Sequence, residues 1–162
     1  MLFDLLNSLF GVAAVGAFLS LAFLFPEKDG LLTSASQRLT AKLPILILAW
    51  LISAIGNLLA TLANLFELSI LDVLDITTIR SYVTQTSLGK LQLFQVVAAL
   101  LLLIFAKIIK KTGGAFLAYL FSISALIAPI FQSHSSQAGS HGLAIGSLII
   151  HVIALSTWVG AV

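Results

Sequence analysis

Long apolar stretches constrain this chain more than any other feature of its sequence. A helix needs about 20 predominantly apolar residues to cross the hydrocarbon core of a bilayer. Five segments reach or approach that length: Leu5–Phe25, Leu43–Phe66, Leu91–Ile109, Ala115–Phe131 and Gly142–Val162. In the second segment, Pro44 suits the first turn of its helix. The predicted fold is therefore all-α, a polytopic membrane helix bundle with about five transmembrane helices.

The composition argues against most soluble functions. Charged residues make up 9% of the 162 residues, whereas a soluble domain has about 25%. The net charge is only +2, and no basic cluster is long enough to follow a nucleic acid backbone. The sequence has no paired carboxylates inside a span, no glycine-rich phosphate loop and no acid partner for a Ser–His pair. We therefore do not expect an enzyme.

The basic residues collect on alternate loops, which predicts the orientation. Six of the eight follow the first or the third span: Lys28, Arg38, Lys42, Lys107, Lys110 and Lys111. Loops rich in Lys and Arg face the cytoplasm, so the N-terminus is predicted outside, in a multi-pass protein of the cell (plasma) membrane. The Phe131–His141 loop then faces the extracytoplasmic side. The mixed segment Leu68–Leu88 is predicted to hold a short amphipathic, interfacial helix.

The last span ends without a basic stop. We therefore interpret residues 1–162 as a single membrane domain and as the N-terminal fragment of a longer polytopic protein. The alternative is a compact five-span protein.

Polar side chains inside the second span share one helical face. Trp50, Asn57 and Asn64 follow one another at spacings of seven, which aligns them along the helix. They are interpreted either as interhelical hydrogen-bonding groups that pack the bundle or as a polar wall along an ion route.

The three histidines are the candidate metal ligands. The chain has no cysteine and its single methionine is Met1, so a metal must use His, carboxylate, Asn or backbone ligands. His134 and His141 flank a polar loop that could bring both rings to one ion. His151 lies near the middle of the bilayer, with Trp158 on the same helical face. An unpaired histidine at that depth is costly, which indicates function; the alternatives are solvated loop histidines and a packed His151.

Two segments resemble the copper resistance D (CopD) family. The stretches 134–141 and 151–160 are similar to the family's His-rich outer loop and to the following helix, which reads roughly H-x-x-A-x-x-x-W-x-G-G. Segment 81–90 is similar to the connection before the third span in actinobacterial members, which are fused to a CtaG-like cytochrome oxidase assembly domain. Ala161 departs from the motif, because the family often has glycine there. No acidic residue precedes His151 by three or four positions, where many relatives have Asp.

The resemblance implies copper handling. Copper import, or delivery toward cuproenzymes, would use His134 and His141 for capture at the outer face and His151 as acceptor inside the bundle. The expected partners are the lipid bilayer, the copper ion, and an extracytoplasmic copper donor or respiratory oxidase assembly proteins. Two alternatives stay open: a haem-binding membrane electron carrier, which lacks a second deep axial ligand, and a non-catalytic assembly partner of a respiratory oxidase.

Overall fold

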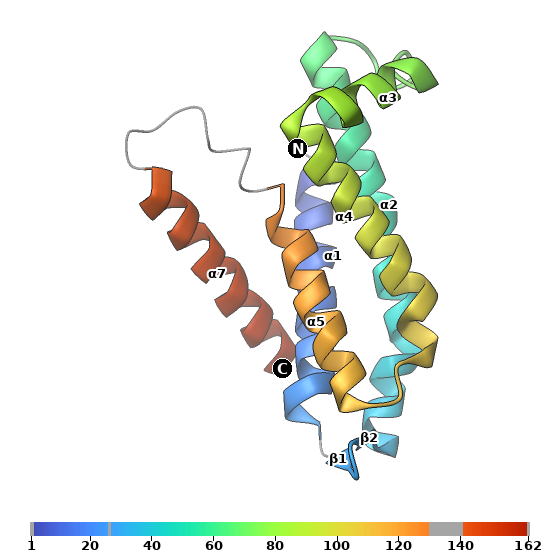
Figure 1. Cartoon of the computed structure of the whole chain (residues 1–162), viewed down its shortest axis with the longest axis vertical. Coiled ribbons are helices and arrows are strands. Elements are labelled where there is room, and N and C mark those ends of the chain that lie inside the picture. The colour runs from blue at the N-terminus through green and yellow to red at the C-terminus, as the bar shows by residue number, and fades with distance from the viewer. Residues whose placement is uncertain (1, 26, 130–140, 162) are drawn as a thin grey trace.

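The chain folds into a bundle of helices with one short hairpin (Figure 1). The computed structural model describes residues 2–25, 27–129 and 141–161. In chain order, the elements are α1 (Leu2–Leu19), the π-helical turn η1 (Ser20–Leu24), β1 (Glu27–Lys28), β2 (Leu31–Leu32), α2 (Ser34–Phe66), α3 (Ile76–Gln85), α4 (Ser87–Phe105), the 3-10 turn η2 (Ala106–Ile108), α5 (Thr112–Ile127) and α7 (His141–Ala161). The predicted all-α membrane bundle is confirmed.

The long helices coincide with the predicted spans. Three described segments are long and apolar enough to cross a membrane: Leu2–Leu24, Ser36–Phe66 and Ser87–Ile108. Two further apolar helices are shorter, Thr112–Ile127 and Gly146–Val159. The number of spans and the outside position of the N-terminus stay predictions.

α2 differs from its prediction at its N-terminal end. It begins at Ser34, so Pro44 lies inside the helix instead of in its first turn. The apolar segment Ser36–Phe66 has 31 residues, which at a rise of 1.5 Å corresponds to roughly 47 Å. The hydrocarbon core is about 30 Å thick. The first turns of α2 therefore extend beyond the hydrocarbon layer.

α1 is the central helix of the bundle. It contacts α2, α5 and α7, and its residues Ala14, Val15 and Phe18 are fully buried. Small residues allow helices in lipid to approach closely, and Gly11 is an example. A Cβ atom at Gly11 would lie 2.9 Å from Nε1 of Trp50, which is itself fully buried. Gly11 thus sets the distance between α1 and α2.

The two basic loops meet at one end of the bundle. The Leu32 amide donates to the Lys110 carbonyl at 3.0 Å, and the Thr112 amide donates to the Gly30 carbonyl at 3.1 Å. The hairpin is thereby attached to the α4–α5 connection. The N-terminus and α3 lie at the opposite end (Figure 1). The alternation of basic loops therefore matches the ends of the bundle, while the membrane side that each end faces stays a prediction.

α3 confirms the short helix predicted within the second connection. Its N-cap is Asp75, whose side chain accepts a hydrogen bond from the Thr78 amide at 2.9 Å. This bond favours the charged carboxylate and lowers the pKa of Asp75. α3 packs on α4 through the buried Tyr82, so it covers one end of the bundle.

Replacing Gly11 by alanine should loosen the contact between α1 and α2. Because the added methyl group meets the Trp50 ring and Leu126, we expect Gly11→Ala to lower the free energy of unfolding by about 1–3 kcal/mol. Thermal unfolding of the purified protein in detergent measures this. Gly113→Ala is the control, because its Cβ would meet nothing within 4 Å. Equal stabilities for the two variants would contradict the assignment.

Candidate functional site

A polar cavity lies at the end of the bundle that carries the N-terminus and α3. Its volume is about 360 Å³, and its walls come from α1, α2, α4, α5 and α7. The polar lining residues are Asp4, Asn7, Ser8, Asn57, Thr61, Asn64, Gln92 and Gln95. Polar groups of this kind are costly in a hydrocarbon environment unless they are paired or face water. The cavity is therefore the main candidate for a functional site among the described residues.

One hydrogen-bond chain joins α3, α4 and α2 along the wall of the cavity. The Tyr82 hydroxyl donates to Oε1 of Gln92 at 2.7 Å, and Nε2 of Gln92 donates to the Thr61 hydroxyl at 3.0 Å. Thr61 in turn donates to the Asn57 carbonyl at 2.7 Å. Burial disfavours the tyrosinate and raises the pKa of Tyr82 to about 12. Tyr82 thus remains a hydrogen-bond donor at neutral pH and holds Gln92 in place.

A second hydrogen bond between side chains joins α1 to α4. Nδ2 of Asn7 donates to Oε1 of Gln95 at 3.1 Å, and the two side chains are only 6% and 1% exposed. Oδ1 of Asn7 has no hydrogen-bond partner within the described part of the chain. A buried acceptor without a partner costs about 1–3 kcal/mol. Asn7 lines the cavity, but its Oδ1 is itself buried.

The residues of α1 and α4 on this wall were not among the predicted site residues. Gln92 and Gln95 stand three residues apart in an otherwise apolar helix, so their shared face was visible in the sequence. Asn7 is a single polar residue near the chain start, and nothing in the sequence pairs it with Gln95. They are 88 residues apart in the chain, and the tertiary fold brings their side chains within hydrogen-bond distance.

The four predicted pathway or packing residues divide between different environments. Asn57 and Asn64 line the cavity. Trp50 is fully buried in the contact between α1 and α2, whereas Trp158 is 68% exposed. Trp50 packs between the helices, but its Nε1 has no hydrogen-bond partner among the described residues, so it does not form the expected interhelical hydrogen bond. The two asparagines lie where a polar wall was expected, and a role for them on an ion route stays a prediction.

The three predicted histidines all follow α5 in the chain. His134 lies outside the described residues, and His141 is the first residue of α7. The segment that joins them connects Pro129 to α7, and both Pro129 and Val152 line the cavity. α7 lies at the edge of the bundle (Figure 1).

His151 lies on the exposed face of α7 and not inside the bundle as expected. α7 packs mainly on α1, and Ser156 is buried while Trp158 is exposed. His151 and Trp158 share a face, as predicted, but this face points away from the other helices. Nδ1 of His151 lies 2.7 Å from the Ser147 carbonyl oxygen. A carbonyl only accepts, so Nδ1 carries the proton and donates, which leaves the Nε2 lone pair as a potential metal ligand.

His141 and His151 lie at two separate positions along α7. His141 and His151 are ten residues apart, which corresponds to a rise of about 15 Å. One ion cannot bind both rings at once. Within residues 2–25, 27–129 and 141–161, no group of three His, Cys, Asp or Glu side chains comes together. Any metal chemistry of α7 would thus proceed through separate positions.

Comparison with known proteins gives one match. The sequence profile of the family described as "Copper resistance protein D-like, N-terminal domain" matches residues 1–160. No curated protein and no solved structure matches the chain.

Tyr82→Phe should destabilise the cavity wall. It removes the only donor that the described chain offers to Oε1 of Gln92, so we expect a loss of about 1–3 kcal/mol in the free energy of unfolding. Denaturation of the purified protein in mixed micelles measures the loss. Tyr119→Phe is the matched control, because the Tyr119 hydroxyl has no hydrogen bond within the described residues. Equal losses in both variants would refute the role of Tyr82.

The Tyr82 hydroxyl should make the free energy of unfolding decrease at alkaline pH. The pKa of Tyr82 is about 12 in the fold and about 10 in an unfolded chain. Its contribution is therefore fully present below pH 10 and is lost as the pH rises toward 12. Thermal unfolding between pH 9 and 12 should show a decline for the wild type that is steeper than for Tyr82→Phe. Parallel curves for the two proteins would contradict this.

Proposed function

Because the chain belongs to the copper resistance protein D-like family, we propose that it moves copper, by import or by delivery toward cuproenzymes. The match of the family profile to residues 1–160 is the observation that carries this proposal. The family indicates a copper-related function in the membrane, and the long apolar helices agree with that environment. Copper is the cargo, and the histidines are its ligands.

Capture begins at the connection before α7. His134 and His141 bind the incoming ion through imidazole nitrogen, which suits Cu(II) and also holds Cu(I). The chain has no cysteine and no internal methionine. Without thiolate or thioether ligands, copper is held with moderate affinity, which suits transfer better than storage.

The polar cavity serves as the approach for the hydrated ion. Its amide and hydroxyl oxygens, together with the carboxylate of Asp4, replace part of the water shell. These oxygens are poor ligands for a soft ion, so copper is not retained there. Asn57 and Asn64 on the α2 wall keep the route polar between apolar helices.

His151 then receives the ion and presents it to a partner. The hydrogen bond from Nδ1 to the Ser147 carbonyl orients the ring and leaves Nε2 free. Because His151 lies on the outer face of α7, copper on Nε2 is accessible to another protein. A respiratory oxidase assembly protein fits this position as recipient, whereas an extracytoplasmic copper donor would act at the capture position before α7.

Histidine variants test the proposal. We expect His134→Gln/His141→Gln/His151→Gln to bind copper more than about tenfold more weakly than the wild type, as expected when ligands are removed from a metal site. His151→Gln alone should keep the capture position and slow copper uptake into proteoliposomes. Elemental analysis of the purified full chain and uptake assays measure the two effects.

Ser147→Ala is the control, because it removes a hydroxyl from the same face of α7 and keeps the carbonyl that orients His151. It should bind and transport copper as the wild type does. Unchanged copper content and uptake in the triple variant would overturn the proposal. A Soret absorption band in the purified wild-type protein would instead indicate haem.

A further inference from the structure

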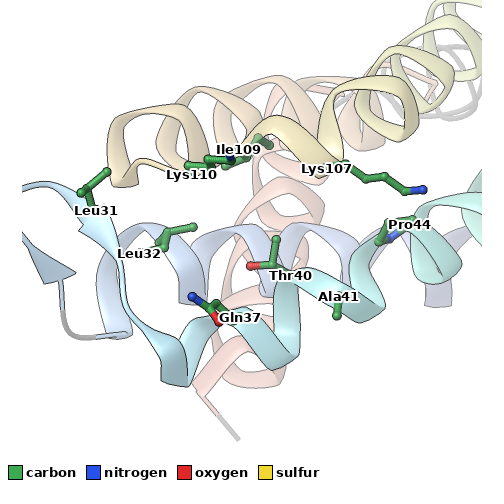
Figure 2. Close-up of a pocket in the computed structure, with 9 residues that line it drawn as sticks. All are labelled: Leu31, Leu32, Gln37, Thr40, Ala41, Pro44, Lys107, Ile109 and Lys110. Atoms are coloured by element: carbon green, nitrogen blue, oxygen red, sulfur yellow. The ribbon is translucent and has the colours of Figure 1, made fainter.

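A second cavity lies at the opposite end of the bundle, where the basic loops meet. Its volume is about 680 Å³ (Figure 2). One wall is β2 with Leu31 and Leu32, another is formed by the first turns of α2, and the third is the connection between α4 and α5 with Lys107 and Lys110. We call this cavity the basic groove.

The basic groove has walls that are joined by backbone hydrogen bonds. The Leu32 amide donates to the Lys110 carbonyl at 3.0 Å, which ties the apolar wall to the lysine wall. The second bond, from Thr112 to Gly30 at 3.1 Å, holds the hairpin turn against the start of α5. The groove therefore exists as a shaped feature and not merely as a cluster of surface charges.

The charged side chains that line the basic groove are lysines. Lys107 and Lys110 line the groove, and none of its described lining residues is acidic. Both lysines are exposed, and neither forms an ion pair within the described part of the chain. Lys28, Arg38, Lys42 and Lys111 add positive charge at the same end and exceed the two acidic residues of the hairpin, Glu27 and Asp29. Two uncompensated ammonium groups beside an apolar wall match an anionic, amphipathic ligand.

The predicted span boundaries place the groove at the depth of the lipid headgroups. Pro44 and Ile109, which line it, stand at the boundaries where the second span begins and the third ends in the sequence prediction. The first turns of α2 pass beyond a hydrocarbon layer of about 30 Å. Basic pockets between transmembrane helices at this depth suit phospholipid headgroups.

We propose that the basic groove binds one anionic phospholipid of the adjoining leaflet. The phosphate is recognised by Lys107 and Lys110, and the glycerol and the upper acyl chain lie on Leu31 and Leu32. This inference is independent of copper handling. The competing explanation is that the lysines act only through the general surface charge of this end.

Lipid binding to the purified full chain tests the proposal. Native mass spectrometry in detergent, with added phosphatidylglycerol or phosphatidylcholine, should show selective retention of phosphatidylglycerol. Near a surface each lysine is worth about 1 kcal/mol toward anionic lipid, so Lys107→Gln/Lys110→Gln should weaken binding by on the order of tenfold. Lys107→Arg/Lys110→Arg, which keeps both charges, should retain binding.

The matched control is Arg38→Gln/Lys111→Gln, which removes two charges from the same end without touching the lining of the groove. It should bind phosphatidylglycerol as the wild type does. Equal weakening in this control would show general surface charge and overturn the proposal, as would equal retention of phosphatidylcholine. Inorganic phosphate should fail to displace the lipid; displacement at equal concentration would assign the groove to a free phosphate instead.

Discussion

The absence of water in the hydrocarbon core of a bilayer is the constraint on which this structure depends. Each backbone amide and carbonyl there must find its partner within the chain, and a helix satisfies this requirement segment by segment. Hydrophobic burial does not drive these helices together, because lipid is as apolar as their side chains. Their association depends on close packing, and Gly11 beneath Trp50 is the clearest instance. α1 is the centre of the bundle because its small residues let α2, α5 and α7 approach it.

The same constraint explains where the polar side chains lie. Tyr82, Gln92 and Thr61 satisfy one another across three helices, and Asn7 pairs with Gln95 across two. The remaining acceptor of Asn7 is buried without a partner among the described residues, although Asn7 lines the cavity. Apart from Tyr82, the polar side chains that join the helices thus also line the cavity.

The two ends of the bundle differ in chemistry. At one end, neutral amides and a carboxylate line a small cavity. At the other, two lysines and the apolar strand β2 line a groove that has no acidic residue among its described lining residues. This division follows from the alternation of loops, since consecutive connections of an antiparallel bundle emerge at opposite ends. Copper handling is proposed for the first end and attachment to lipid for the second, so the two activities do not compete for residues.

The sequence by itself determined the class of fold, the approximate position of each long helix and the grouping of the basic loops. Hydrophobic length and loop charge are local properties, so they can be read without coordinates. The prediction placed Pro44 in the first turn of α2, whereas the helix begins at Ser34 and continues through the proline. Tertiary structure alone decided that Asn7 meets Gln95, that Trp50 packs while Asn57 faces a cavity, and that His151 points outward. These outcomes depend on the rotation of each helix about its axis, which is set by close contacts between helices distant in sequence.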